Sequence, residues 1–197
     1  SKGIIREYFD PVSIARSYET YGAAAISVLT DERFFLGSLE HLEKIRRQVS
    51  VPLLRKDFLF DEYQIYEARA FGASAVLLIV SILDETQLRD LSAVAQQAGM
   101  DCLVEVHDEA ECDRAVKIGA RLIGVNNRDL RTFLTNTRIS ERLVQYLPDD
   151  VFVVSESGLH SVEQLKKLEA EGVGAFLIGE TFMAAPDPGE SLGRFLG

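Results

Sequence analysis

Several short apolar runs of this sequence end in a side chain that could do acid-base chemistry. Lys56, Glu105 and Asn126 each follow such a run, and Glu156 closes another. Buried parallel strands have this pattern when their carboxyl ends carry the chemistry. Brought to one rim, these residues would supply a proton donor, a proton acceptor and an orienting amide.

The roles of Lys56 and Glu105 depend on how closely the two lie together. Lys56 could be a general acid, a Schiff-base nucleophile or an anion clamp, with Asp57 holding its ammonium, or it could be an ordinary solvated lysine. Glu105 interrupts an apolar strand, where an unpaired carboxylate would be costly to bury. The two residues lie two predicted strands apart, and alternate strands of a barrel contribute to the same interior layer. They form either a buried salt bridge or an acid/base pair.

Two glycine-containing turns are candidates for holding an anion. Ser157-Gly158 follows one predicted strand, and Gly179-Glu180 follows the next. Glycines let backbone amides approach an anion beside a helix amino end, and barrels hold phosphate at these two strands. Glu180 would then turn its carboxylate away and offer only its amide. Ordinary turns would explain each loop singly.

Other candidates lie in a polar segment and an aromatic pair. Asn126 could orient a substrate hydroxyl or carbonyl and Arg128 could bind an anion, or both could belong to a turn. Phe34-Phe35 could form an aromatic wall for a ring-bearing substrate, or pack as an ordinary staple. We expect no metal site, because ligand spacing is missing around His41, His107 and His160.

Strands and helices alternate along the chain, as expected for an α/β fold. We predict strands at 24–29, 51–54, 75–79, 101–106, 122–125, 151–154 and 175–178. We predict helices at 11–21, 37–48, 62–71, 85–98, 109–118, 140–146, 162–169 and 189–195. Strand starts recur about every 25 residues, the length of one unit of a TIM (β/α)8 barrel. Seven strands and eight helices leave the first strand of such a barrel missing, and therefore an open edge.

Composition is that of one compact domain spanning residues 1–197, with 47% apolar and 26% charged residues. A net charge of −10 argues against nucleic acid or anionic membrane as partners, but not against a small phosphorylated ligand. The longest apolar stretch, at 73–80, is too short to span a bilayer, and no signal pattern opens the chain, so we expect a cytoplasmic protein. Cys102 and Cys112 are expected as buried thiols, not a disulfide.

These motifs closely resemble the indole-3-glycerol-phosphate synthase family of tryptophan biosynthesis. The resemblance runs from end to end and rests on segments 1–3, 22–31, 54–65, 76–79, 105–107, 123–130, 155–158 and 177–180. That family converts 1-(2-carboxyphenylamino)-1-deoxyribulose 5-phosphate to indole-3-glycerol phosphate, losing carbon dioxide and water without a cofactor. The resemblance implies the same decarboxylating ring closure, on a phosphorylated small molecule, for this chain.

The resemblance also implies a role for individual residues. It makes Lys56 the general acid that protonates the leaving hydroxyl and Glu105 the general base. The other implied substrate contacts are Asn126, Glu156 and Ser157 around the substrate, Phe35 and Leu83 against its aromatic part, and Arg128, Gly158, Gly179 and Glu180 at its phosphate.

The sequence departs from the family at its amino terminus. The family has a first strand with a Glu-x-Lys pair, preceded by a helical extension, and neither occurs here. We therefore expect the chain to begin just after the first barrel strand and to be a monomer or weak homodimer that could pair through the open edge. Two alternatives stay open: a non-catalytic or split barrel fragment that needs the missing strand, and a Schiff-base sugar-phosphate aldolase or isomerase.

Overall fold

The computed structural model describes residues 6, 9–129, 132 and 134–197. Its elements are α1 (Pro11–Thr20), β1 (Ile26–Leu29), α2 (Glu32–Phe35), α3 (Leu39–Arg46), β2 (Leu53–Lys56), α4 (Glu62–Ala70), β3 (Ala75–Ile79), η1 (Val80–Ile82), α5 (Glu85–Gln97), β4 (Asp101–Val106), α6 (Glu109–Lys117), β5 (Leu122–Asn126), α7 (Arg138–Tyr146), β6 (Phe152–Glu156), α8 (Val162–Ala170), β7 (Ala175–Leu177), α9 (Glu180–Met183) and α10 (Pro188–Leu196). The motif at 1–3 and residue Leu130 lie outside the described residues.

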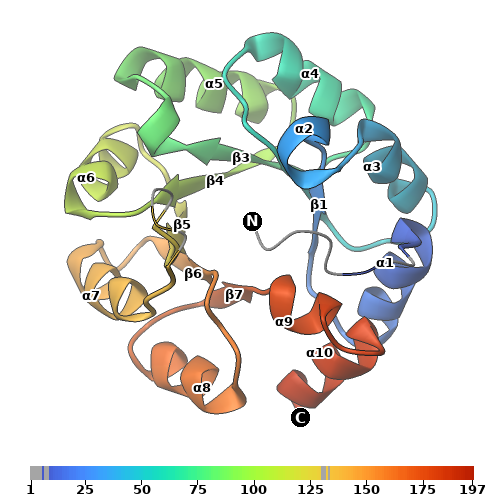
Figure 1. Cartoon of the computed structure of the whole chain (residues 1–197). Helices are drawn as coiled ribbons and strands as arrows, with labels where there is room; N and C mark the ends of the chain where they lie inside the picture. Colours follow the sequence, from blue (N-terminus) through green and yellow to red (C-terminus); the bar gives the residue numbers. More distant parts are fainter. Residues whose placement is uncertain (1–5, 7–8, 130–131, 133) are drawn as a thin grey trace.

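The sheet is parallel and curls around a central axis. Among the described residues it has seven strands, hydrogen-bonded in the order β1 to β7. In the view of Figure 1 the longer helices form a ring outside the strands. Within the described part of the chain, β1 and β7 are each paired on one side alone, so the barrel is open between them. This confirms the prediction of a seven-stranded (β/α) barrel with an open edge.

The predicted elements agree with the observed ones to within two residues at each end. The small differences matter at three strands, because β2, β5 and β6 run on to include Lys56, Asn126 and Glu156, each placed just beyond a strand by the prediction. Two short helices, α2 and α9, and the 3-10 turn η1 were not predicted, because an element of three or four residues has no periodicity to detect.

Two apolar layers follow from the alternation of side chains along each strand. Outward residues such as Val76 and Ile123 pack with the helices in the larger core cluster. Inward residues form a smaller cluster inside the barrel, with Leu54, Leu77, Ile79, Leu103 and Val154 at its centre. The lower barrel is therefore filled, which leaves the carboxyl ends of the strands for polar side chains.

Local sequence signals set the helix bounds. Asp61 and Asp84 form capping boxes with Gln64 and Gln87 at the starts of α4 and α5. Gly72 follows α4 with a φ of +94°, a left-handed conformation that glycine adopts without steric cost. These residues thus set the start of α4 and α5 and the end of α4.

The helices and the two cysteines bear on the predictions about membranes and disulfides. Within the described ranges, no helix has the length and apolar character needed to cross a membrane. Cys102 and Cys112 are free thiols, as predicted; Cys112 is buried, whereas Cys102 is half-buried. Burial raises the pKa of Cys102 to about 11 and that of Cys112 to about 12.

Candidate active site

Lys56 ends β2 with a carboxylate on either side of its ammonium. Its Nζ is 2.8 Å from Glu156 Oε2 and 3.4 Å from Glu105 Oε2. The Glu156 and Glu105 side chains are 1% and 3% exposed, and that of Lys56 is 23% exposed. The three residues come from β2, β4 and β6, alternate strands whose inward side chains share one layer of a barrel. Lys56 is therefore not an ordinary solvated lysine.

Burial and mutual charge shift the pKa values of this group. Burial acts to lower the pKa of Lys56, but the charges of Glu156 and Glu105 outweigh burial and raise that pKa above its ordinary value. Burial raises the pKa of Glu156, the Lys56 ammonium opposes that shift, and the charge of Glu105 adds to it. Lys56 is thus held as a cation, and Glu156 gives up its proton less readily than an exposed glutamate.

Asn126 ties the end of β5 to this group. Its Nδ2 donates to Glu105 Oε1 at 3.1 Å, and its Oδ1 accepts the backbone N–H of Arg128 at 3.0 Å. The residue is 7% exposed. Both ends of the amide are therefore engaged, which fixes the orientation of Glu105 from the neighbouring strand.

Glu156 occupies space that a glycine on the neighbouring strand β5 leaves open. A Cβ added at Gly124 would lie 2.1 Å from Glu156 Oε1 and 3.2 Å from a methyl carbon of Leu103. Glu156 Oε1 is buried and has no hydrogen-bond partner among the described residues. The lack of a side chain at Gly124 therefore permits the Lys56–Glu156 contact.

A buried asparagine fixes the end of β6. Asn127, with 0% exposure, donates through Nδ2 to Ser155 Oγ and to the carbonyls of Glu156 and Ser157, at 3.0, 2.9 and 3.1 Å. Its Oδ1 accepts from the backbone N–H and the hydroxyl of Ser140, at 3.1 and 2.9 Å. Ser157 then turns with a φ of +66°. Asn127 thus holds Glu156 and Ser157 in place through their backbone.

Asp57 does not hold Lys56, so that expectation is wrong. Its Oδ2 accepts from the Thr30 hydroxyl at 2.6 Å and lies 3.0 Å from Arg55 Nη2. Arg55 is buried on the outer side of β2, where it also pairs with Glu67 at 2.9 Å. Residues one apart in a strand point to opposite faces, which explains why Asp57 serves Arg55 and leaves Lys56 to the interior carboxylates.

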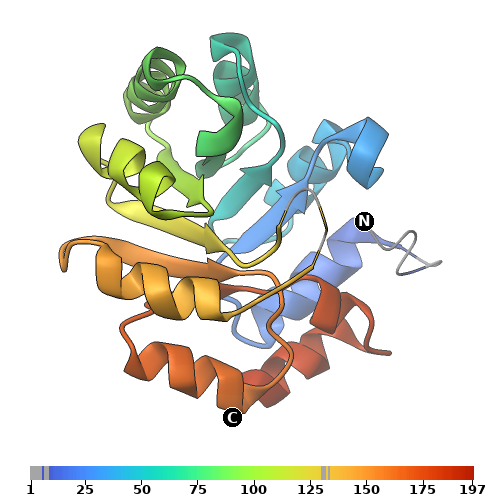
Figure 2. The same ribbon diagram turned by 60° about the vertical axis from the view of Figure 1, so that its left-hand side comes forward.

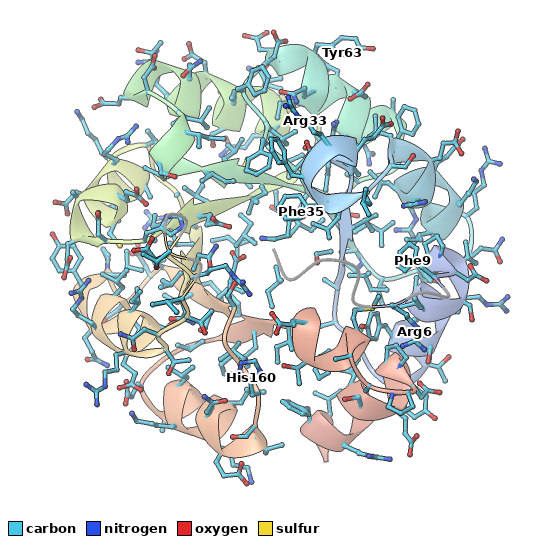
Figure 3. All side chains as sticks on the ribbon, viewed as in Figure 1. Arg6, Phe9, Arg33, Phe35, Tyr63 and His160 are labelled. Atoms are coloured by element: carbon cyan, nitrogen blue, oxygen red, sulfur yellow. The ribbon has the colours of Figure 1, made fainter. Side chains whose placement is uncertain are left out.

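Three phenylalanines, two from α2 and one that follows β2, pack into an aromatic cluster. The rings of Phe35 and Phe58 stack with centroids 5.7 Å apart, and Phe34 packs edge-on against Phe58 at 6.0 Å. Phe35 is 39% exposed, and Figure 3 shows it on α2 facing the middle of the barrel. Leu83 does not join them: it is buried in the outer cluster, because η1 turns the chain away from the barrel interior before it.

Arg128 and Glu180 pair across the rim, which corrects the expectation for Glu180. Arg128 Nη2 lies 3.1 Å from Glu180 Oε2, with the side chains 22% and 29% exposed. The carboxylate was expected to turn away from this region. Arg128 follows β5 and Glu180 begins α9, and opposite charges attract at this distance, so Glu180 faces the guanidinium instead.

The two glycine turns lie side by side. The Thr181 hydroxyl donates to the Leu159 carbonyl at 2.6 Å, which joins the start of α9 to the loop after β6. Gly158 has a φ of +72°, and a Cβ at Gly179 would meet nothing within 4 Å. The loops expected to hold an anion are therefore adjacent, with open space at Gly179.

Sequence reasoning missed three residues of this region. His107 Nε2 lies 3.5 Å from Glu105 Oε1, Phe58 carries the aromatic stack, and Asn127 organises β6. His107 and Phe58 each follow an interior residue by two positions, so strand alternation could have placed them. Asn127 points to the other face, and nothing in its sequence context signals its buried partners.

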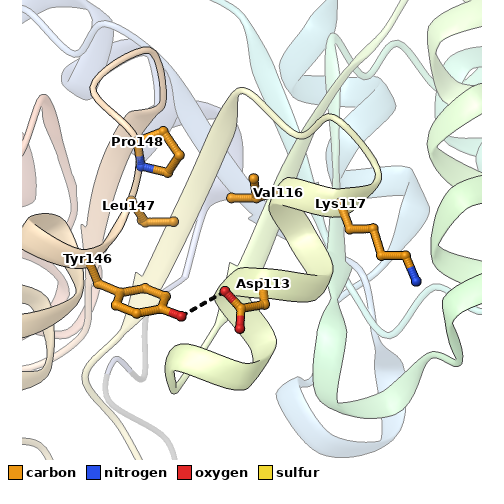
Figure 4. A pocket seen from close by; sticks show the side chains of 6 residues that line it. All are labelled: Asp113, Val116, Lys117, Tyr146, Leu147 and Pro148. Carbon is orange, nitrogen blue, oxygen red and sulfur yellow. Dashed lines mark hydrogen bonds between the residues drawn. The ribbon is translucent and has the colours of Figure 1, made fainter.

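A separate pocket lies on the outer ring of helices. It has a volume of about 380 Å³ and lies between α6 and α7, where the Tyr146 hydroxyl contacts Asp113 at 2.8 Å (Figure 4). Its lining residues are Asp113, Val116, Lys117, Tyr146, Leu147 and Pro148. None of the predicted site residues lines it.

The parallel barrel, with polar side chains at the carboxyl ends of its strands, places the chain among α/β-barrel enzymes. Within that class, the sequence profile of the indole-3-glycerol phosphate synthase family matches residues 1–195, and the chain belongs to this family.

Individual relatives agree with this assignment. The chain is 52% identical over 195 residues to an indole-3-glycerol phosphate synthase of Acetivibrio thermocellus, covering 99% of this chain and 75% of the relative. It is 50% identical over 192 residues to one of Albidiferax ferrireducens, covering 98% and 73%. The fold is also similar to KGPDC from Streptococcus mutans, with a TM-score of 0.73 and 15% identity over 94% of this chain and 89% of that one. The last likeness concerns the fold alone.

Proposed function

We propose that this chain, as one barrel domain spanning 1–197, catalyses the ring closure of 1-(2-carboxyphenylamino)-1-deoxyribulose 5-phosphate to indole-3-glycerol phosphate. The observation that carries the proposal is the Lys56 ammonium held between two buried carboxylates at the barrel opening. The family membership supplies the reaction, a step of tryptophan biosynthesis.

The reaction defines what the side chains must do. The ring carbon that bears the carboxylate attacks the ketose carbonyl, carbon dioxide leaves, and the former carbonyl oxygen leaves as water. Two protons must reach that oxygen, and one must leave the carbon–nitrogen frame when the indole double bond forms. The site therefore needs a proton donor and a proton acceptor on opposite sides of one reacting region.

Lys56 fits the donor role. Its raised pKa keeps the ammonium charged, so it can hold and donate a proton to the leaving hydroxyl. A Schiff-base lysine must instead be a neutral amine, which needs a lowered pKa. This direction favours the synthase over the aldolase or isomerase alternative.

Glu105 fits the acceptor role, with Asn126 fixing its orientation at 3.1 Å. Glu156 is the carboxylate closer to Lys56, and we assign it to hold the ammonium in position. Because the side chains of Glu105 and Glu156 are almost fully buried, water competes little with these contacts.

The remaining substrate contacts follow from the rim. We propose that Phe35 and Phe58 receive the aromatic ring, since their rings stack and Phe58 packs against the cluster inside the barrel. The backbone amides at Gly158 and Gly179, with Arg128, would receive the phosphate. Ser157 would contact the substrate between the two ends.

The test is turnover of the purified chain with this substrate, followed by the fluorescence of the indole product. Lys56→Ala and Glu105→Gln should each lower kcat by at least about a hundredfold, the scale of losing a positioned acid or base. Lys117→Ala is a matched control, because it removes an exposed lysine–glutamate pair that joins the outer helices α6 and α5 through Glu85. Near-wild-type rates in either site variant would contradict the assigned roles.

The open sheet edge favours a second candidate: a barrel that works only with another strand beside β1 and β7. Adding a peptide with the family's first strand to the chain should then raise turnover from a low level. Full turnover without the peptide would exclude this candidate. A cytoplasmic location and a monomeric or weakly dimeric state stay predictions, which fractionation and sedimentation would check.

A further inference from the structure

His107 connects a second carboxylate to Glu105. It follows β4, and its Nδ1 lies 3.0 Å from Glu111 Oε2, in the first turn of α6. The same oxygen accepts the backbone N–H of His107 at 2.8 Å. On the other side of the ring, Nε2 lies 3.5 Å from Glu105 Oε1. The imidazole is therefore placed between two carboxylates, one of them the proposed base.

The contacts of the two ring nitrogens of His107 indicate which of them carries a proton. A carboxylate oxygen can only accept, so Nδ1 must carry a proton to bind Glu111. Nε2 is buried and has no hydrogen-bond partner among the described residues. If Nε2 were unprotonated, its lone pair would face the Glu105 carboxylate at 3.5 Å, whereas a protonated Nε2 would place a positive charge there. The geometry therefore favours an imidazolium whenever Glu105 is ionised.

We propose that His107, oriented by Glu111, is a positioning residue that places a positive charge beside Glu105 Oε1 and so directs this carboxylate into the barrel as the base. The inference rests on the proposed function, because it assumes that Glu105 is the base. A general base must start each turnover without a proton, and a fixed positive charge beside it meets that need. Lys56, which contacts Glu105 Oε2, also has to serve as the proton donor. A second cation beside Oε1 therefore lets Lys56 donate its proton while Glu105 keeps a positive charge next to it.

The charges around the imidazole agree with this assignment. Glu105 contacts it from β4 and Glu111 from α6, the charge of Glu156 on β6 also acts on it, and Lys56 on β2 contacts the other oxygen of Glu105. Burial acts to lower the pKa of His107, but the hydrogen bond to Glu111 and the charges of Glu105 and Glu111 outweigh it and raise the pKa.

The first measurement needs no turnover. Nitrogen-15 NMR of the full chain should show His107 protonated on Nδ1 and titrating above the ordinary histidine value of about 6.5. Glu111→Gln should lower that midpoint, because it removes a carboxylate charge at 3.0 Å from Nδ1. A neutral ring with its proton on Nε2, or a midpoint at or below the ordinary value, would overturn the proposal.

The second measurement is the pH profile of kcat/KM in His107→Gln, which keeps a donor but loses the charge. Its acid limb should move to higher pH by at least about one unit, the usual effect of an opposite charge on a nearby carboxylate. Glu111→Gln should move the acid limb in the same direction by a smaller amount. If His107→Gln does not fold, Glu111→Gln alone provides the test. His41→Gln, on the outer helix α3, is the matched control and should leave the profile unchanged.

The outcomes separate the inference from the proposed function. A lower rate with an unmoved acid limb would mean that His107 only supports the turn before α6, and would refute the inference. No turnover in the wild-type chain would count against the proposed function, and the NMR result would still decide the protonation of His107.

Discussion

Gly124→Ala provides a sharp test of the packing beneath the Lys56 group. The added Cβ would lie 2.1 Å from Glu156 Oε1, so that oxygen must move by about 1.3 Å to reach an ordinary contact of 3.4 Å. Glu156 is 1% exposed and its backbone is held by Asn127, so the carboxylate has to swing within a packed interior. The contact it would lose is the one to Lys56 at 2.8 Å.

The cost of this displacement follows from Coulomb's law. When the whole carboxylate moves by that amount, the contact of Oε2 with Lys56 lengthens from 2.8 Å and weakens by about 2 kcal/mol at an effective dielectric constant of about 20. Overpacking against Leu103 adds a cost of about 1 kcal/mol or more. We expect the free energy of unfolding to fall by about 3 kcal/mol. We expect kcat to fall roughly a hundredfold, since the Lys56 ammonium loses its positioning partner and a misplacement of about 1 Å in a site has that effect.

Urea unfolding and the indole-fluorescence assay measure the two effects. Gly119→Ala is the control, because its Cβ meets nothing within 4 Å while its φ of +82° still strains an alanine. It should lose about 1 kcal/mol of stability with no change in kcat. Wild-type stability and kcat in Gly124→Ala would refute the reasoning about Glu156.

Three further predictions address the rest of the site. Asn127→Ala should lower the free energy of unfolding by about 3 kcal/mol in urea titrations, because it strands several buried donors and acceptors; a loss below about 0.5 kcal/mol, the usual effect of a surface change, would contradict its central place. Arg128→Ala should raise the KM with little change in kcat, and Glu180→Gln should lower the KM by removing a negative charge beside the phosphate; steady-state kinetics decide, and unchanged KM values would place the phosphate elsewhere. The raised pKa of His107 stabilises the fold fully below the unfolded value of about 6.5, and that contribution disappears as the pH rises through the folded value. The stability difference between wild type and His107→Gln should therefore shrink from pH 6 to pH 9, and a growing difference would reverse the sign of the coupling.

Strand alternation explains why much of the site could be predicted. Lys56, Glu105 and Asn126 follow apolar runs, and a barrel brings such strand ends to one rim whatever their separation in sequence. The open edge could be predicted by counting strands. Both inferences need only the local period of the sequence and one topological rule.

The partners of each charge could not be predicted in the same way. Asp57 is adjacent to Lys56 in sequence but serves Arg55, and the closer partner of Lys56 is Glu156, a hundred positions away. Glu180 was expected to turn away but pairs with Arg128. Such pairings depend on distances between strands and loops, which periodicity does not report.

The central claim is that Lys56 and Glu105 flank one bound substrate at the open end of the barrel. A crystal structure of the chain with indole-3-glycerol phosphate tests it most directly. The account predicts the phosphate at the amides of Gly158 and Gly179, the indole ring beside Phe35, and the Lys56 ammonium within hydrogen-bond reach of the product. Product bound elsewhere, such as in the pocket between α6 and α7, would contradict it.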